Sequence, residues 1–266
     1  QLKAYEADHG TVIVMETKTG EVKAMANLGK ASNDTYYERL IYGVGESHEP
    51  GSTFKLMAMV AALEDKVIDT SYVVDTSGGV MTFFGKYKVV DSKRGGYGKL
   101  SAARAFEVSS NVGLVKIINN HYKNNPKRFV ESLYKMNLND KLGLKIKGEG
   151  SPKIPHPDQK DWSGISLPWM AYGYGVALTP LQTLTFYNAI ANNGEMVRPR
   201  FVKEIRSWDK PVEVFDKDVI NPKICSQETI DKVKEMMLGK TSMFSGHSGT
   251  GKSTLINALE PSLNLK

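Results

Sequence analysis

The sequence predicts a mixed α/β fold of the α+β kind, because patterns typical of helices and of short strands alternate along its 266 residues. A hairpin pattern opens the chain, an unbroken apolar run follows it, and a capped helix lies in the second half. With 41% hydrophobic and 24% charged residues, the composition is that of a globular protein. A chain of this length can bury a substantial core.

The first elements are a hairpin and a buried helix. β-rich runs over 11–15 and 21–26 flank a turn in which Gly20 can supply a positive φ. The apolar run over 54–63 contains neither glycine nor proline and therefore predicts a buried helix. Lys55 is the exception within this run.

The remaining elements follow from periodicity and turn residues. Thr179 and Pro180 are a favourable cap and first residue for a helix that runs to Ala191, and Asn193-Gly194 ends it. The other expectations are short strands and turns over 77–98, helices over 102–108, 112–122 and 227–237, a loop over 148–162, and strands up to Phe215.

Composition and spacing disfavour several classes of function. The net charge of +6 is scattered among acidic residues, which argues against nucleic-acid binding. The single cysteine, Cys225, permits neither an intrachain disulfide nor a cysteine metal cluster. His48, His121 and His156 stand apart from other ligands at metal-binding spacing, so no metal site is expected. No apolar run reaches bilayer length, and the chain does not open with a signal peptide.

Ser52 and Lys55 form a Ser-x-x-Lys pattern, which places both side chains on one face if a helix starts near Ser52. Serine needs a base to become a nucleophile, and a lysine desolvated in an apolar helix can supply a neutral amine. The same pattern occurs at Ser132–Lys135 and Ser207–Lys210, without a Pro-Gly entry or an apolar helix. In these two copies we expect the lysine to be a solvated residue on a polar surface, without a catalytic role. Ser52 is therefore our candidate nucleophile.

Ser109 and Asn111 form a second candidate element, Ser-x-Asn, in a loop between two predicted helices. Ser109 could relay a proton, and Asn111 could orient a substrate amide. Ser-x-Asn also occurs at 262–264, so the pattern alone is not specific. The position of Ser109 and Asn111 after the Ser52 motif is what makes them candidates.

The ordered motifs Ser52-x-x-Lys55 and Ser109-x-Asn111 resemble those of the penicillin-binding proteins. Three longer segments resemble the septal, class B members and extend the resemblance over residues 1–238: His48–Lys55, Phe106–Asn111, and Gly173-Tyr174-Gly175 with Thr179–Gln182.

The resemblance implies the transpeptidase fold shared with serine β-lactamases, and acylation of Ser52 by a D-alanyl-D-alanine stem peptide. Lys55 would be the base and Ser109 the proton relay, without metal or organic cofactor. β-Lactams would acylate the same serine. The implied place is the periplasmic face of the inner membrane, anchored by an upstream helix and near cell-division proteins.

The third family motif, Lys-Thr-Gly, departs from its usual place. Its literal copy, Lys18-Thr19-Gly20, precedes Ser52 and falls in the predicted hairpin turn, so we reject it as catalytic. Lys240, Thr241 and Ser242 form a variant and are candidate substrate-binding residues. We expect the family's C-terminal strands and helix to be missing. Loss of one hydrogen-bond donor of the oxyanion hole lowers the catalytic rate by about a hundred- to a thousandfold. A missing Lys-Thr-Gly strand would therefore strongly reduce the activity of the site.

Residues 239–266 carry a different pattern, a P-loop with Gly246, Gly251, Lys252 and Ser253 as candidate nucleotide-binding residues. It resembles the circularly permuted GTPases of ribosome assembly, without their guanine-recognition motif. We interpret this strand-loop-helix fragment as a fusion, a recombination junction or an assembly error. The leading hypothesis is therefore a D,D-transpeptidase. The two alternatives are a fragment that binds GTP phosphates and an inactive structural domain of the division machinery.

Overall fold

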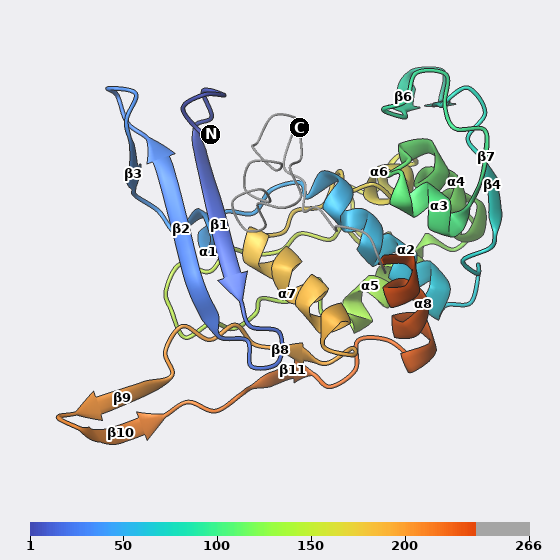
Figure 1. Cartoon of the computed structure of the whole chain (residues 1–266). Coiled ribbons are helices and arrows are strands. Elements are labelled where there is room, and N and C mark those ends of the chain that lie inside the picture. Colours follow the sequence, from blue (N-terminus) through green and yellow to red (C-terminus); the bar gives the residue numbers. More distant parts are fainter. Residues whose placement is uncertain (238–266) are drawn as a thin grey trace, which may run out of the picture.

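The computed structural model describes residues 1–237 and confirms the mixed α/β class (Figure 1). The strands are β1 (His9–Met15), β2 (Val22–Lys30), β3 (Tyr36–Glu38), β4 (Val73–Asp75), β5 (Val80–Phe83), β6 (Tyr87–Val90), β7 (Lys99–Ser101), β8 (Met196–Val197), β9 (Glu204–Ser207), β10 (Lys210–Val214) and β11 (Val219–Asn221). The helices are α1 (Tyr42–Gly45), the 3-10 helix η1 (Gly51–Phe54), α2 (Lys55–Glu64), α3 (Ala102–Glu107), α4 (Asn111–Tyr122), α5 (Pro126–Lys135), α6 (Ser166–Met170), α7 (Pro180–Ala191) and α8 (Gln227–Met237).

The predicted N-terminal hairpin is confirmed. Strands β1 and β2 pair antiparallel, with His9 opposite Gly29 and Val14 opposite Ala24. Gly20 in the turn has a φ of 72°, and a Cβ there would lie 2.5 Å from the Arg198 carbonyl oxygen, so glycine is required. Strand β3 joins the far side of β2, which leaves β1 at an edge of the sheet formed by the described strands.

Helix α2 is the centre of the main core, as its apolar run predicts. Every residue from Lys55 to Leu63 is buried, and the side chain of Phe54 is fully buried just before the helix. Helices α4, α5 and α8 pack around it. Each large apolar side chain buried here contributes about 1.5–3 kcal/mol. The 3-10 helix, rather than α-helix, carries Ser52, so the α-helix begins three residues later than the motif suggests.

Helix α7 joins the N-terminal sheet to this core. It has the predicted cap, because the Thr179 hydroxyl accepts from the Gln182 backbone while the Gln182 side chain accepts from Thr179. A second apolar cluster, built on Val44, Leu142 and Leu181, lies under the sheet. The chain turns after the helix at Gly194, whose φ is 93°.

The other predicted elements are present, and three helices were not predicted. Helices α3, α4 and α8, the loop over 148–162 and the short strands within 77–98 are all confirmed. Helices α1, α5 and α6 were missed, although Asn125 and Pro126 give α5 a recognisable cap. The hairpin of β9 and β10 projects from the rest of the fold (Figure 1). None of the described helices is long and apolar enough to span a bilayer.

Candidate active site

The backbone around Ser52 is shaped by two glycines that meet across the fold. Gly51 has a φ of 56°, and its N–H donates to the Gly173 carbonyl oxygen at 3.0 Å. Gly173 has a φ of 89°, and a Cβ on it would lie 1.8 Å from the Gly51 carbonyl oxygen. Only glycine permits this approach. The sharp turn thus brings the segment around Gly173 directly against the residue that precedes Ser52.

Two further contacts fix the Ser52 segment. The carboxylate of Glu49 accepts from the Gly175 N–H at 2.8 Å. The hydroxyl of Tyr187, on α7, donates to the Thr53 carbonyl oxygen at 2.9 Å. The Ser52 hydroxyl itself makes no hydrogen bond to any group within residues 1–237. The segment is therefore anchored through its neighbours, and the serine oxygen is left available.

Lys55, the first residue of α2, directly follows this segment and is held by the second predicted motif. Its side chain is only 1% exposed. The ammonium Nζ donates to the Ser109 carbonyl oxygen at 2.7 Å, to Ser109 Oγ at 2.8 Å and to Asn111 Oδ1 at 2.6 Å. Three donors therefore meet three acceptors. The structure brings together the Lys55, Ser109 and Asn111 side chains named from the sequence.

The environment of Lys55 favours its neutral form. Burial lowers the pKa of Lys55 to about 8, while the negative charge of Asp91 acts in the opposite direction. Desolvation disfavours the ammonium, as expected for a lysine inside an apolar helix. A usable fraction of this amine is consequently neutral near physiological pH, which a general base requires.

Asp91 is a residue of this site that the sequence reasoning missed. Its Oδ1 accepts from the Ser110 hydroxyl at 2.9 Å and from the Val112 N–H at 3.0 Å, at the start of α4. It is 4% exposed, and its Oδ2 makes no hydrogen bond to the described residues. A buried carboxylate thus shapes the loop that carries Ser109 and Asn111. No nearby motif marks it, because the contact spans 19 residues of sequence.

Asn111 is held in place from a second direction. Its Nδ2 donates to the Val90 carbonyl oxygen at 2.8 Å while its Oδ1 accepts from Lys55. Ser109 has a φ of 53°, an uncommon backbone conformation for a residue other than glycine. The short turn between α3 and α4 thus presents both the Ser109 carbonyl and its hydroxyl to the same lysine.

The rejected copies of the motifs have structural roles. Lys18-Thr19-Gly20 forms the predicted hairpin turn, which packs against α7 through a bond from Asn188 Nδ2 to the Thr17 carbonyl. Ser132 hydrogen-bonds to the Asp65 carboxylate, and Lys135 is exposed. Ser207 and Lys210 lie on the exposed hairpin of β9 and β10.

Seven candidate residues lie outside the described residues: Lys240, Thr241 and Ser242 of the variant motif, and Gly246, Gly251, Lys252 and Ser253 of the P-loop. The boundary at residue 238 and the expected loss of C-terminal strands also fall at or beyond the end of the described part. These predictions stay predictions.

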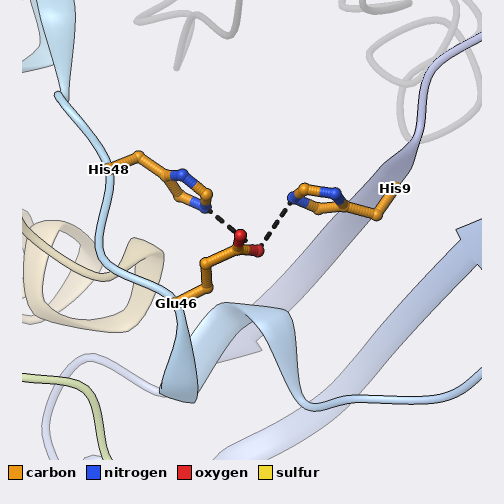
Figure 2. A group of neighbouring side chains, drawn as sticks. All are labelled: His9, Glu46 and His48. Carbon is orange, nitrogen blue, oxygen red and sulfur yellow. Dashed lines mark ion pairs between the residues drawn. The ribbon is translucent and has the colours of Figure 1, made fainter.

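One expectation about the histidines is wrong. His48 does not stand apart from other ligating side chains, because it lies beside Glu46 and His9 (Figure 2). The spacing from Glu46 to His48 was visible in the sequence, but His9 reaches the pair only through folding of the N-terminal hairpin.

Comparison with known proteins shows the family. The chain matches the penicillin binding protein transpeptidase domain over residues 10–257, and it belongs to that family. It is 30% identical to penicillin-binding protein PbpB of Mycolicibacterium smegmatis over 215 residues, 77% of this chain and 32% of that protein. It is 27% identical to peptidoglycan D,D-transpeptidase FtsI of Escherichia coli over 236 residues, 85% of this chain and 37% of that protein.

A solved structure shows the same fold. Penicillin binding protein 3 of Mycobacterium tuberculosis, complexed with aztreonam, superposes with a TM-score of 0.69 and 28% identity, covering 88% of this chain and 53% of that one. The chain spans about a third of the length of the curated relatives that it matches. The predicted penicillin-binding transpeptidase fold is therefore confirmed.

A short segment has a second relationship. Over 37 residues, 14% of this chain and 11% of the relative, the sequence is 78% identical to the small ribosomal subunit biogenesis GTPase RsgA of Flavobacterium johnsoniae. This agrees with the predicted GTPase-like pattern. The family match to the transpeptidase domain nevertheless runs past residue 238 and ends at residue 257.

Proposed function

We propose that this chain is the acyl-transfer part of a septal, class B peptidoglycan D,D-transpeptidase, with Ser52 as its nucleophile. The observation that carries the proposal is the setting of Lys55, which is buried three residues after Ser52 and donates to three acceptors of Ser109 and Asn111. A purely structural lysine has little reason to be buried in an apolar helix. The D,D-transpeptidase name of the Escherichia coli relative supports the same reaction.

In the acylation step, the neutral Lys55 amine accepts the Ser52 proton while Ser52 Oγ forms a bond to the carbonyl carbon of the penultimate D-alanine. The peptide bond breaks as the terminal D-alanine nitrogen takes a proton, and D-alanine leaves. The acyl group remains as an ester on Ser52. An amine of a neighbouring stem peptide then attacks this ester, losing a proton, and Ser52 Oγ recovers one.

Ser109 is suited to carry the proton between Lys55 and the leaving nitrogen. With protonated Lys55 its Oγ accepts from Nζ, and with neutral Lys55 its hydroxyl can turn and donate. Asn111 has a different role. Its Nδ2 carries two hydrogens, of which one bonds to the Val90 carbonyl oxygen, and the other is available to a substrate carbonyl.

The proposed substrates are peptidoglycan stem peptides, with β-lactams as substrate mimics that stop at the acyl-enzyme. The aztreonam complex of the Mycobacterium tuberculosis relative supports β-lactam binding by this fold. The proposed place of the reaction is the periplasmic face of the inner membrane, among cell-division proteins, and the relationship to peptidoglycan D,D-transpeptidase FtsI supports it. Lys240, Thr241 and Ser242 are proposed to contact substrate beside Ser52.

Covalent labelling with a fluorescent penicillin tests this proposal on the full chain. We expect the wild-type protein to carry the label through denaturing electrophoresis and Ser52→Ala to carry none. Ser207→Ala is the matched control, because Ser207 belongs to an exposed Ser-x-x-Lys copy. Equal labelling of Ser52→Ala would reject Ser52 as the nucleophile. A folded wild-type chain without label would favour the inactive structural domain of the division machinery.

The segment related to RsgA supports a second candidate function, binding of GTP phosphates by a P-loop. Gly246, Gly251, Lys252 and Ser253 are the proposed contacts, with Lys252 on the phosphates and Ser253 on Mg²⁺. Calorimetry with GTP and Mg²⁺ on the full chain tests it. Heat that disappears in Lys252→Ala supports binding, whereas no heat from the wild-type chain rejects it.

A further inference from the structure

Three side chains with metal-binding chemistry converge outside the proposed catalytic group. His9 begins β1, Glu46 follows α1, and His48 lies four residues before Ser52. Figure 2 shows both imidazole rings facing the Glu46 carboxylate from opposite sides. Their ligand atoms all lie within 4.8 Å of one another. The geometry points to a binding site for a divalent transition-metal ion, Zn²⁺ in the first place, formed by His9, Glu46 and His48.

The distances fit one ion shared by three ligands. Glu46 Oε2 lies 3.0 Å from His9 Nε2 and 3.4 Å from His48 Nε2. Around tetrahedral zinc with ligand bonds of 2.0–2.1 Å, neighbouring ligand atoms lie about 3.3 Å apart. The side chains therefore need only small adjustments to bind the ion. Two imidazoles and one carboxylate leave the fourth position to water, a common zinc arrangement.

The carboxylate oxygen between the rings lies within ion-pair distance of both imidazoles but accepts no hydrogen bond from the described residues. Glu46 Oε2 is inaccessible to solvent and makes no hydrogen bond to the described residues, although two imidazole nitrogens lie beside it. The Glu46 side chain as a whole is 43% exposed, so the missing hydrogen bond concerns this one oxygen, which faces the two rings. A cation bound by all three groups would give this oxygen a partner, and the ligand set of two neutral imidazoles and one carboxylate has a net charge of −1.

The backbone holds the ligands in place without the metal. His48 exchanges two hydrogen bonds with Leu178, at 3.0 and 2.9 Å. The Glu46 N–H donates to the Tyr42 carbonyl oxygen at 3.3 Å, and the Tyr42 ring stacks on His9 with centroids 4.3 Å apart. Little ordering therefore accompanies binding. Imidazole ligands select a transition metal over Mg²⁺ or Ca²⁺, which prefer oxygen.

The bound ion would connect the start of β1 to the segment that leads into Ser52. The inference does not depend on the proposed reaction, because metal binding can be measured without any acyl transfer. It also differs from an ion pair of Glu46 with protonated histidines, which would take up no metal.

Zinc binding by the full chain is measured by dialysis against Zn²⁺, then against metal-free buffer, and elemental analysis. We expect one zinc ion per chain. The zinc affinity of each variant is measured by competition with a chromophoric chelator. Glu46→Gln and His48→Ala should each bind zinc at least about a hundredfold more weakly than the wild type. Loss of a residue that only hydrogen-bonds to a ligand would lower the affinity by about ten- to a hundredfold. His156→Ala should bind as the wild type does, because within residues 1–237 His156 pairs with a single carboxylate, that of Asp158, at 3.5 Å.

Two results would reject the proposed zinc site. A folded wild-type chain that retains no zinc would reject it. So would a His9→Ala/His48→Ala double variant that binds zinc as tightly as the wild type. His247→Ala, in the part of the chain outside the described residues, should leave the stoichiometry unchanged. Cobalt(II) gives an independent readout, since tetrahedral coordination by the wild-type chain should produce visible absorption that both His48→Ala and Glu46→Gln lose.

Discussion

Acylation of Ser52 should depend on pH through Lys55. Burial lowers the pKa of this lysine to about 8, so about one chain in ten has the neutral amine at pH 7 and about nine in ten at pH 9. Only the neutral amine can accept the serine proton. The second-order rate constant for acylation should therefore rise about tenfold from pH 7 to pH 9 and level off above pH 9.

Two variants separate Lys55 from other titrating groups. Lys55→Ala removes the base and should slow acylation by about a hundred- to ten thousandfold at all pH values. Asp91→Asn removes a negative charge that favours protonated Lys55. The pKa of Lys55 should then fall further, and the midpoint of the pH profile should move to lower pH.

The assay is stopped-flow or gel-based acylation by a fluorescent penicillin over pH 6 to 10, with circular dichroism at each pH as a control for folding. A profile that is flat through pH 8 would refute Lys55 as the base. A midpoint that moves to higher pH in folded Asp91→Asn would refute the electrostatic account of this site.

Three further predictions concern stability and packing. Gly173→Ala should lower the free energy of unfolding, measured by chemical denaturation, by about 3 kcal/mol or more and should slow acylation. Gly175→Ala should lower the same free energy by only about 1 kcal/mol, because a Cβ at this position meets open space. Cys225 is 5% exposed and burial raises its pKa to about 12, so a thiol reagent at pH 8 should modify it only after unfolding. Thr179→Ala should cost about 1 kcal/mol, whereas Thr179→Ser should retain the cap.

Each of these three has a contradicting result. Equal losses in the two glycine variants would show that the contact between Gly173 and Gly51 does not matter. Fast modification of native Cys225 would contradict its burial. A Thr179→Ala variant as stable as the wild type would show that the capping box contributes nothing to α7.

Local patterns predicted most of the fold. The run after Ser52 identified α2 because a buried helix needs apolar residues on all sides, and Thr179-Pro180 identified the start of α7 because a cap is a local feature. Short elements such as α1 and α6 were missed because four or five residues carry no periodicity. Helix α5 follows the same local rule as α7, because Asn125 caps it and Pro126 is its first residue.

Within the candidate site, residues that belong to short sequence motifs could be predicted, whereas a residue whose partners are distant in sequence could not. Ser52, Lys55, Ser109 and Asn111 belong to short motifs, and the structure brings the last three into direct contact. Asp91 could not be found in this way, because its partners are Ser110 and Val112 in a separate element. A charged residue in a strand-rich segment gives no sign of burial until the tertiary structure is known.

The group of His9, Glu46 and His48 shows the same limit. His9 is 37 positions before Glu46 in the sequence, and the two meet only because β1 passes α1 in the fold. Searching for histidines near other ligands in sequence therefore misses a site assembled by a hairpin and a loop.

Peptide mapping of the penicillin adduct by mass spectrometry tests the central claim most directly. After incubation of the full chain with benzylpenicillin and digestion, the account predicts one modified peptide, heavier by the whole penicillin molecule, with the added mass on Ser52. An adduct on any other residue, or an unmodified Ser52 in a folded chain at saturating penicillin, would contradict it.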